Sequence, residues 1–274
     1  MMFEKIVKNV KEKKPLVHHI TNYVTVNDCA NIVLACGASP IMADDEAEVE
    51  EIASICDSLV INIGTLNVKT IESMIKAGKT ANKLGRPVIL DPVGAGASAL
   101  RTNTVFRLLN EVKFSVIRGN ISEIKTIALG NGYTKGVDAA DADLMTGNYR
   151  ETTVSLANSV SEKTGAVVVV TGETDIVANQ TETFCIKNGH EMMSRITGSG
   201  CMLTSVIGAY CGANRMRILQ SAVAAVAAMG ICGERAFNKV HATDGGTGLF
   251  RAYLIDYMSK LNETTLKAGM KIEY

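Results

Sequence analysis

The chain has 274 residues and a mass of 29.2 kDa, enough for one large core or for two small domains at most. Its 47% hydrophobic and 20% charged residues exclude intrinsic disorder and suit a compact enzyme. Because 28 basic residues balance 28 acidic ones, no basic surface that could neutralise nucleic-acid phosphates is expected. The low aromatic content of 5%, with no tryptophan, also argues against base stacking.

Short apolar runs alternate with amphipathic stretches along the first two thirds of the chain. Several runs are continuous in Val and Ile, which is typical of strands covered on both faces in a parallel sheet. The alternation predicts a layered α/β fold that binds ligands beyond the carboxyl ends of its strands. The predicted strands are Leu16–Ile20, Leu59–Ile63, Val88–Leu90, Phe114–Ile117, Val167–Val170, Ile176–Ala178 and Thr183–Ile186, with the last two as the only hairpin. The predicted helices are Val26–Ala35, Glu46–Ile55, Val68–Leu84, Thr104–Val112 and Glu151–Lys163.

The last third of the chain is predicted to be helical, with two Ala- and Met-rich helices at about 201–211 and 216–237 and an amphipathic one at 249–261. The most apolar stretch, Ala222 to Gly233, has only about 12 residues, whereas crossing a bilayer takes about 20. We therefore expect a buried helix there and no membrane span. No linker or repeat divides the chain, and its only long polar loop covers about 130–150, so one domain over residues 1–274 is expected.

The seven cysteines are odd in number, form no CxxC pair and lie mostly in apolar segments. The first residues, MMFEKIVKNVKEKK, are amphipathic and too charged for the apolar part of a secretory signal. Together these features predict reduced, buried thiols in a cytoplasmic protein.

Two glycine motifs resemble phosphate-binding loops but lack the context that such loops need. Gly78-Lys79-Thr80 lies inside a predicted helix, and Ser73 stands where a P-loop requires glycine. Gly94-Ala95-Gly96-Ala97-Ser98-Ala99 follows a strand, but Asp91-Pro92 separates them and a carboxylate there would repel a pyrophosphate. We therefore expect neither motif to bind a nucleotide.

The sharpest local signal is Thr197-Gly198-Ser199-Gly200-Cys201, directly before an apolar run. The glycines allow close backbone approach, and the start of the following helix presents unpaired N–H groups and partial positive charge. The segment predicts an anion site, where the Cys201 thiol should ionise more readily than a free thiol. A glycine-rich turn with an incidental cysteine explains the same pattern.

Polar residues also lie near the ends of three predicted strands. Asp91 follows Val88–Leu90, where α/β enzymes hold metals or catalytic acids, and Thr171-Gly172 could meet a nucleotide. Asn120 and Glu123 share a helix face and could hold hydrated Mg²⁺, with Arg118 beside them to neutralise phosphate. Each feature has a structural alternative: a helix capping box for Asn120 and Glu123, and strand-end turns for the others.

The first predicted strand ends in His18-His19-Ile20-Thr21-Asn22. Adjacent side chains on a strand face opposite sides, so the two histidines cannot chelate one metal together, and no zinc-binding spacing occurs. Asn22 is the better ligand candidate. Met42 offers a polarizable side chain suited to an uncharged ring, although core methionines are more common.

Taken in order, six segments resemble the hydroxyethylthiazole kinase family, a branch of the ribokinase-like superfamily, from about Pro15 to the last helix. They are PLVHHITNYVTVNDCANIVLACGASPIM, NIGTL, VILDPVGAGAS, IRGNISE, VVVTGE and TGSGC. The resemblance implies a three-layer ribokinase-like fold, with a mostly parallel central sheet and helices on both faces. It also implies phosphorylation of the hydroxyl of 4-methyl-5-(2-hydroxyethyl)thiazole with ATP and Mg²⁺ in thiamine salvage, by a homotrimer.

The resemblance assigns the candidate residues to four roles. It implies ATP binding by Arg118, Thr171 and Gly172; thiazole binding by Met42, Gly198, Asn22 and Gly64; Mg²⁺ binding by Glu123, Asn120 and Asp91; and catalysis by Cys201, Gly200 and Ser199. Cys201 occupies the position where sugar kinases of the superfamily carry an aspartate base. The resemblance does not determine whether Cys201 removes the hydroxyl proton before, during or after phosphoryl transfer.

Two alternatives have different consequences. A sibling kinase would act on another vitamin precursor, such as a hydroxymethylpyrimidine or pyridoxal, although Cys201 and the segment HITN favour the thiazole. A protein of another class would bind a nucleotide without kinase activity, or would use Cys201 covalently. The covalent alternative lacks a histidine in any motif that converges on the thiol.

Overall fold

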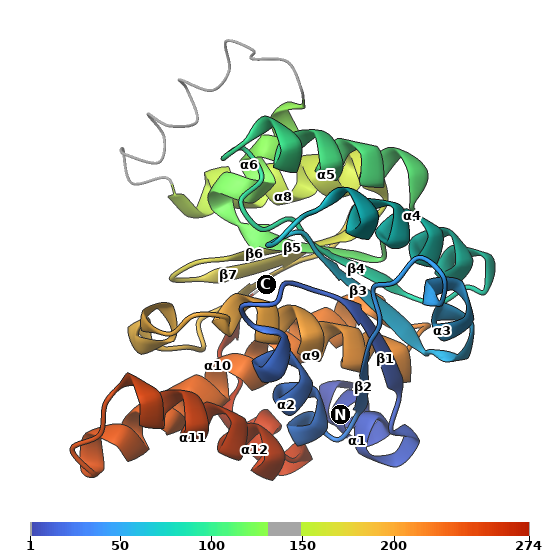
Figure 1. The fold of residues 1–274 in the computed structure, drawn as a ribbon. Helices are drawn as coiled ribbons and strands as arrows, with labels where there is room; N and C mark the ends of the chain where they lie inside the picture. Colours follow the sequence, from blue (N-terminus) through green and yellow to red (C-terminus); the bar gives the residue numbers. More distant parts are fainter. Residues whose placement is uncertain (1, 131–148, 274) are drawn as a thin grey trace.

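We analysed a computed structural model of the chain, in which residues 2–130 and 149–273 are described (Figure 1). Its strands are β1 (Leu16–Ile20), β2 (Ser39–Met42), β3 (Ser58–Asn62), β4 (Val88–Asp91), β5 (Val116–Asn120), β6 (Val167–Thr171), β7 (Asp175–Ala178), β8 (Thr183–Ile186) and β9 (Ile272–Glu273). They form one sheet in the order β2-β1-β3-β4-β5-β6-β7-β8-β9. Neighbours from β2 to β6 pair in parallel, whereas the pairs from β6 to β9 are antiparallel.

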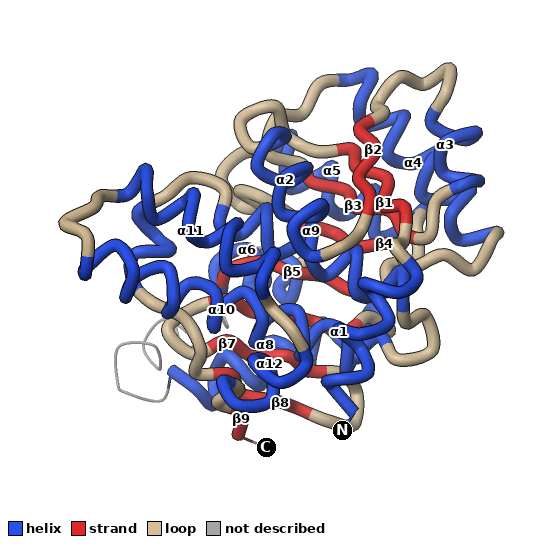
Figure 2. Tube along the Cα trace, turned by 90° about the horizontal axis from the view of Figure 1, so that it is seen from below, coloured by secondary structure: helices blue, strands red, loops and turns tan. Residues whose placement is uncertain are grey.

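The helices before the last third are α1 (Met2–Lys13), α2 (Val26–Cys36), α3 (Val49–Ile55), α4 (Val68–Lys83), α5 (Ala99–Glu111), α6 (Ile121–Leu129) and α8 (Tyr149–Thr164). A 3₁₀ turn at Glu191–Arg195 then precedes α9 (Ser199–Ala213), α10 (Ile218–Ala242), α11 (Thr247–Lys260) and α12 (Glu263–Gly269). One face of the sheet is covered by α3, α4, α5, α6 and α8, and the other by α1, α2 and α9 to α12 (Figures 1 and 2). The predicted three-layer α/β fold is confirmed.

The two helical layers explain the continuous apolar runs of the strands. Successive strand residues point to opposite faces. Val60 and Ile89 join the core beneath α9 and α10, whereas Leu59, Ile61 and Leu90 join the core beneath α4 and α5. Both faces of each central strand are therefore apolar, as the sequence predicted.

All seven predicted strands are present, but two strands were missed and the hairpin prediction was incomplete. β2 is a four-residue edge strand of half-buried residues and β9 has only two residues, so neither forms a buried apolar run. The strand β6 also turns back directly into β7, so Ile176–Ala178 belongs to two antiparallel pairs. Most of the predicted loop at 130–150 lies outside the described residues.

The predicted buried helix around 222–233 is part of α10 and lies in the core. Within residues 2–130 and 149–273, no helix is both long and apolar enough to cross a bilayer. The glycine motif at 78–80 lies inside α4, as expected, so it cannot form a phosphate-binding loop.

Gly208 lets α9 lie close against the sheet. A Cβ atom at this position would lie 2.6 Å from Cγ2 of Val60 and 3.3 Å from Cγ1 of Val17. Both valines are fully buried and β-branched, so they have little freedom to rotate away. The short distance between α9 and the strands β1 and β3 therefore requires a residue without a side chain at position 208.

We expect the substitution Gly208→Ala to lower the free energy of unfolding by about 1–3 kcal/mol, because the extra methyl group overpacks a rigid core. In a helix, alanine is intrinsically more favourable than glycine by about 1 kcal/mol. Helix propensity alone would therefore stabilise the variant, so a loss of stability would come from the overpacking. The matched control is Gly248→Ala in α11, where nothing lies within 4 Å and no loss is expected. Urea unfolding followed by circular dichroism measures both, and equal stability of the two variants would contradict the close packing.

Candidate active site

The candidate residues of the sequence analysis form a row along one edge of the sheet. Parallel strands bring their carboxyl ends to the same edge. In the order of the sheet, the row consists of Met42 in β2, Asn22 after β1, Gly64 after β3, Asp91 in β4, Arg118 and Asn120 in β5, and Thr171 in β6. Residues expected to contact the thiazole therefore lie on one side of Asp91, and those expected to contact ATP lie on the other.

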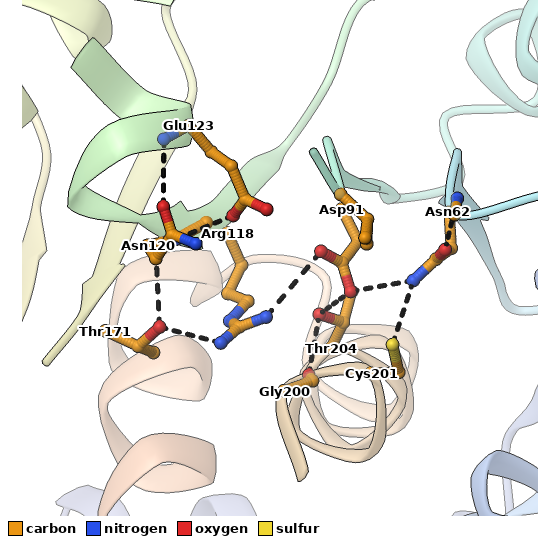
Figure 3. Close-up of polar contacts among 12 residues, drawn as sticks. Asn62, Asp91, Arg118, Asn120, Glu123, Thr171, Gly200, Cys201 and Thr204 are labelled. Atoms are coloured by element: carbon orange, nitrogen blue, oxygen red, sulfur yellow. Dashed lines mark hydrogen bonds and ion pairs between the residues drawn. The ribbon is translucent and has the colours of Figure 1, made fainter. Parts of the chain in front are cut away.

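Asp91 is a fully buried carboxylate at the centre of this row (Figure 3). Its Oδ2 accepts hydrogen bonds from Asn62 Nδ2 and Thr204 Oγ1, both at 2.9 Å. Its Oδ1 lies 3.6 Å from Nη1 of Arg118 and has no hydrogen-bond partner among the described residues. Burial raises the pKa of Asp91 to about 6, against the attraction of Arg118 and with a further increase from Glu123.

Arg118 is held between the sheet and the first turn of α9. Its Nη2 donates a hydrogen bond of 2.7 Å to Thr171 Oγ1. A Cβ atom on Gly200 would lie 2.6 Å from the same Nη2, so only glycine at 200 lets the guanidinium pack against the helix. The backbone N–H of Gly172 donates to Asp175 Oδ1 at 3.0 Å and shapes the turn after β6. The structure thus brings the predicted ATP residues together.

The predicted anion site is the N-terminus of α9. Gly198 caps the helix in the left-handed region with φ of 84°, and a Cβ atom there would lie 2.7 Å from Thr25 Cγ2. Ser199 begins the helix, followed by Gly200 and Cys201. The first N–H groups of a helix have no acceptor within the helix, so this turn can donate hydrogen bonds to an anion.

Cys201 faces two asparagine side chains whose orientation is determined by other contacts. Asn22 Oδ1 accepts from the backbone N–H of Thr25 at 3.0 Å, and Asn62 Oδ1 accepts from the backbone N–H of Gly64 at 2.9 Å. A backbone N–H can only donate, so the amide nitrogens must be the atoms that face the sulfur. They lie 3.4 Å and 3.3 Å from Sγ. The sulfur of Cys201 therefore acts as a hydrogen-bond acceptor.

The expectation that Cys201 ionises more readily than a free thiol is wrong. Burial raises the pKa of Cys201, and the nearby negative charge of Asp91 raises it further. Hydrogen bonds from Thr25, Asn22 and Asn62 act in the opposite direction but are smaller effects. Because desolvation and the charge of Asp91 outweigh these hydrogen bonds, the thiol is the resting form near neutral pH.

Asn120 and Glu123 form the capping box that was the structural alternative for this motif. Asn120 Oδ1 accepts from the N–H of Glu123 at 2.9 Å, and Glu123 Oε2 accepts from the N–H of Asn120 at 2.8 Å. Glu123 Oε1 also accepts from the N–H of Gly94 at 2.8 Å, which connects the loop after β4 to α6. Each carboxylate oxygen of Glu123 keeps a further lone pair that could bind a metal ion, whereas Oδ1 of Asn120 is already used in the helix cap.

The acidic side chains fit Mg²⁺ that arrives with phosphate groups. Within the described ranges, no group of three or more His, Cys, Asp or Glu could hold a metal ion. Mg²⁺ usually keeps several waters and takes one or two carboxylates together with substrate phosphates. Asp91 Oδ1, buried and without a hydrogen-bond partner, and Glu123 supply two such carboxylates.

Two residues of the site were not identified from the sequence. Asn62 ends β3 and contacts Asp91 and Cys201, so the reasoning applied to other strand ends would have found it. Thr204 lies one turn after Gly200, inside an apolar helix, and no sequence pattern marks it. Met42, by contrast, ends the edge strand β2 and is half-buried, away from the hydrogen bonds around Asp91.

We expect the substitution Asp91→Asn to change how stability depends on pH. Because the folded-state pKa is raised from 3.8 to about 6, the stability contributed by the protonated form is complete below pH 4 and is lost as the pH rises through 6. Asparagine does not titrate, so the variant escapes this loss. As the pH rises from 4 to 7.5, the free energy of unfolding of the variant should increase relative to that of the unsubstituted protein by on the order of 2–3 kcal/mol.

Urea unfolding of both proteins at the two pH values measures this difference. Asp256→Asn, at an exposed position in α11, serves as the control and should show no comparable gain. A stability difference for Asp91→Asn that is the same at both pH values would contradict the proton affinity derived from burial.

The chain is similar to known proteins in both sequence and fold. The model of the hydroxyethylthiazole kinase family matches residues 7–264. Hydroxyethylthiazole kinase of Clostridium acetobutylicum is 55% identical over 272 residues, which cover 99% of each chain. The structure of hydroxyethylthiazole kinase from Pyrococcus horikoshii OT3 superposes with a TM-score of 0.86 and 35% identity, over 99% of this chain and 98% of that one.

A more distant structure shows the wider fold. An ADP complex of Bacillus subtilis pyridoxal kinase has a TM-score of 0.55 and 13% identity, and the match covers 79% of this chain and 90% of that one. This likeness concerns the ribokinase-like fold alone. The family match and the full-length identity lead to one conclusion: the chain belongs to the hydroxyethylthiazole kinase family.

Proposed function

We propose that this protein transfers the γ-phosphoryl group of ATP to the hydroxyl of 4-methyl-5-(2-hydroxyethyl)thiazole, in thiamine (vitamin B1) salvage and biosynthesis. The observation that carries the proposal is the order of the strand ends, with Asn22 and Gly64 on one side of Asp91 and Arg118 on the other. In phosphoryl transfer the attacking hydroxyl and the leaving oxygen lie roughly in line on opposite sides of the phosphorus, so separate positions for the alcohol and for ATP on either side of Asp91 suit the reaction. Family membership supports the choice of this alcohol.

We assign the two substrates to the two ends of the row. Met42, Asn22, Gly64 and Gly198 would contact the thiazole, an uncharged ring that suits a methionine, amides and closely packed backbone. Arg118, Thr171 and Gly172 would contact ATP. Two contacts support this assignment. Arg118 donates a hydrogen bond to Thr171, and glycine at 200 leaves room for the guanidinium to pack against the first turn of α9.

Mg²⁺ would be held through Asp91 and Glu123, with Asn120 keeping Glu123 in position through the capping box. When bound, the ion would neutralise charge on the phosphates. The Oδ1 of Asp91 supports this role, since it accepts no hydrogen bond from the described residues, faces only the Arg118 guanidinium at 3.6 Å, and could accept a further ligand.

The first turn of α9 would stabilise the transferred group. Backbone N–H groups of Ser199, Gly200 and Cys201 would donate to the phosphoryl oxygens, and one such donor is typically worth about 10²–10³ in rate. Cys201 would contact the attacking hydroxyl and orient it. Because its thiol stays protonated at rest, we infer that the hydroxyl keeps its proton until the new bond to phosphorus is forming.

This role of Cys201 predicts a small effect of substitution. We expect Cys201→Ser and Cys201→Ala to lower kcat by no more than about tenfold, since positioning by the other residues remains. A true general base is worth about 10²–10⁴, and a loss of that size would assign the base role to the thiol instead. Steady-state rates at pH 7.5, with circular dichroism spectra to verify folding, measure the difference.

The proposed activity is tested by ADP release with Mg-ATP and three alcohols: the hydroxyethylthiazole, a hydroxymethylpyrimidine and pyridoxal. We expect selective turnover of the thiazole, because the residues on that side of Asp91 are uncharged. Turnover of another alcohol would assign the chain to a sibling kinase. ATP binding without turnover of any of them would favour a nucleotide-binding protein without kinase activity.

We further propose that residues 1–274 act as one cytoplasmic kinase domain that assembles into a homotrimer. Tyr23 and Val24 support the assembly, because these large apolar side chains are 79% and 60% exposed directly after Asn22, where a second copy could cover them. Buried, unpaired cysteines support a reducing compartment.

A further inference from the structure

Arg101 makes an unusual set of contacts near the candidate site. It lies in the first turn of α5, where a cation is disfavoured by the helix dipole. Its Nη1 donates to the carbonyl oxygens of Ile63 at 3.1 Å and Val93 at 2.5 Å, and its Nη2 donates to that of Gly64 at 2.7 Å. In the described parts of the chain, Arg101 forms no ion pair with a carboxylate. Its guanidinium is therefore committed to three backbone carbonyls.

Those carbonyls belong to two different turns at the sheet edge. Ile63 and Gly64 follow β3, on the side proposed for the alcohol, and Val93 follows β4, on the side proposed for the phosphates. Beyond the last paired residues of these strands, the backbone N–H of Ile63 still donates to the carbonyl of Asp91 at 3.2 Å. Arg101 continues the connection between the strands past the point where the sheet ends.

The glycine-rich segment after Asp91 makes room for this contact. Gly94 has φ of 72°, and a Cβ atom there would lie 3.2 Å from both Cδ and Nη1 of Arg101. The N–H of Gly94 donates to Glu123 Oε1, so the same turn is held by Arg101 on one side and by Glu123 on the other. Packing of the arginine thus accounts for the first glycine of the motif that resembles a dinucleotide-binding loop, whereas a Cβ atom on Gly96 would meet Thr126 Oγ1 at 2.6 Å.

We propose that Arg101 is a positioning residue of the kinase site, which sets the separation between the Ile63–Gly64 turn and the Val93–Gly94 turn. It acts through Gly64 on the alcohol and through Gly94 and Glu123 on the phosphates. This inference rests on the proposed function for its effect on turnover. Arginine is required because its planar fork reaches carbonyls of both turns at once, whereas a lysine ammonium is a compact charge.

The test compares Arg101→Met and Arg101→Lys with Arg107→Met on the same helix. Arg107 pairs with Glu72 and Glu111, partly exposed side chains outside the site, so its loss removes an arginine from α5 without touching either turn. We expect Arg101→Met to lower kcat/KM for the alcohol by about 10²-fold, the effect of a misplacement of about 1 Å. Arg101→Lys should lose about tenfold, and Arg107→Met no more than about twofold.

A rise in KM for the alcohol separates positioning from simple loss of folded protein. A smaller folded fraction lowers the apparent kcat but leaves KM unchanged. We therefore expect KM to rise at least fivefold in Arg101→Met. If that variant does not fold, the same comparison is made with Arg101→Lys. Unchanged KM in the folded Arg101 variants of an active enzyme would overturn the proposal.

Hydrogen exchange tests the same inference without any substrate. Amides at 63–66 and 93–97 should exchange faster in Arg101→Met or Arg101→Lys than in the unsubstituted protein, and at an unchanged rate in Arg107→Met. Equal exchange in all variants would show that Arg101 does not hold the turns. If the unsubstituted protein phosphorylates none of the alcohols, the proposed function fails, while faster exchange at both turns still supports the structural role of Arg101.

Discussion

The burial of the Asp91 carboxylate is the interaction on which the candidate site depends. An ionised carboxylate without water is strongly disfavoured unless polar partners surround it. Those partners come from three elements: Asn62 from β3, Arg118 from β5 and Thr204 from α9. Two strands and one helix must therefore keep their relative positions for the charge to be tolerated. Among the described residues, these partners leave Oδ1 without a hydrogen bond, which is the observation behind the proposed metal role of Asp91.

Three glycines, which have no side chain, allow these polar groups to come into contact. Gly208 brings α9 against β1 and β3, Gly200 admits the guanidinium of Arg118, and Gly94 admits that of Arg101. The two arginines then act differently. Arg118 faces a carboxylate and a hydroxyl and keeps donors available for a ligand, whereas Arg101 uses its donors on backbone carbonyls. One arginine is thus suited to bind phosphate and the other to position the turns around it.

Cys201 shows how tertiary surroundings override a local rule. The start of a helix lowers the pKa of a thiol when water and cations are near. Here the Cys201 side chain is half-buried, lies near the negative charge of Asp91 and accepts hydrogen bonds from two amides, and the net effect raises its pKa. The proposed role, in which the thiol orients the substrate hydroxyl, is consistent with phosphoryl transfer, where positioning and charge neutralisation matter more than the strength of a base.

The sequence by itself determined the layered α/β fold. Continuous apolar runs indicate strands that are buried on both faces, and amphipathic stretches indicate helices that are buried on one face. It also placed Asp91, Arg118 and Thr171 at one edge of the sheet, since the carboxyl ends of parallel strands share an edge. Short elements such as β2 and β9 escaped detection because they bury too little apolar surface to leave a pattern. Only the tertiary structure decided the partners of Asp91, the direction in which the pKa of Cys201 shifts and the contacts of Arg101. Those properties depend on desolvation and on contacts between residues far apart in the chain, which no local pattern records.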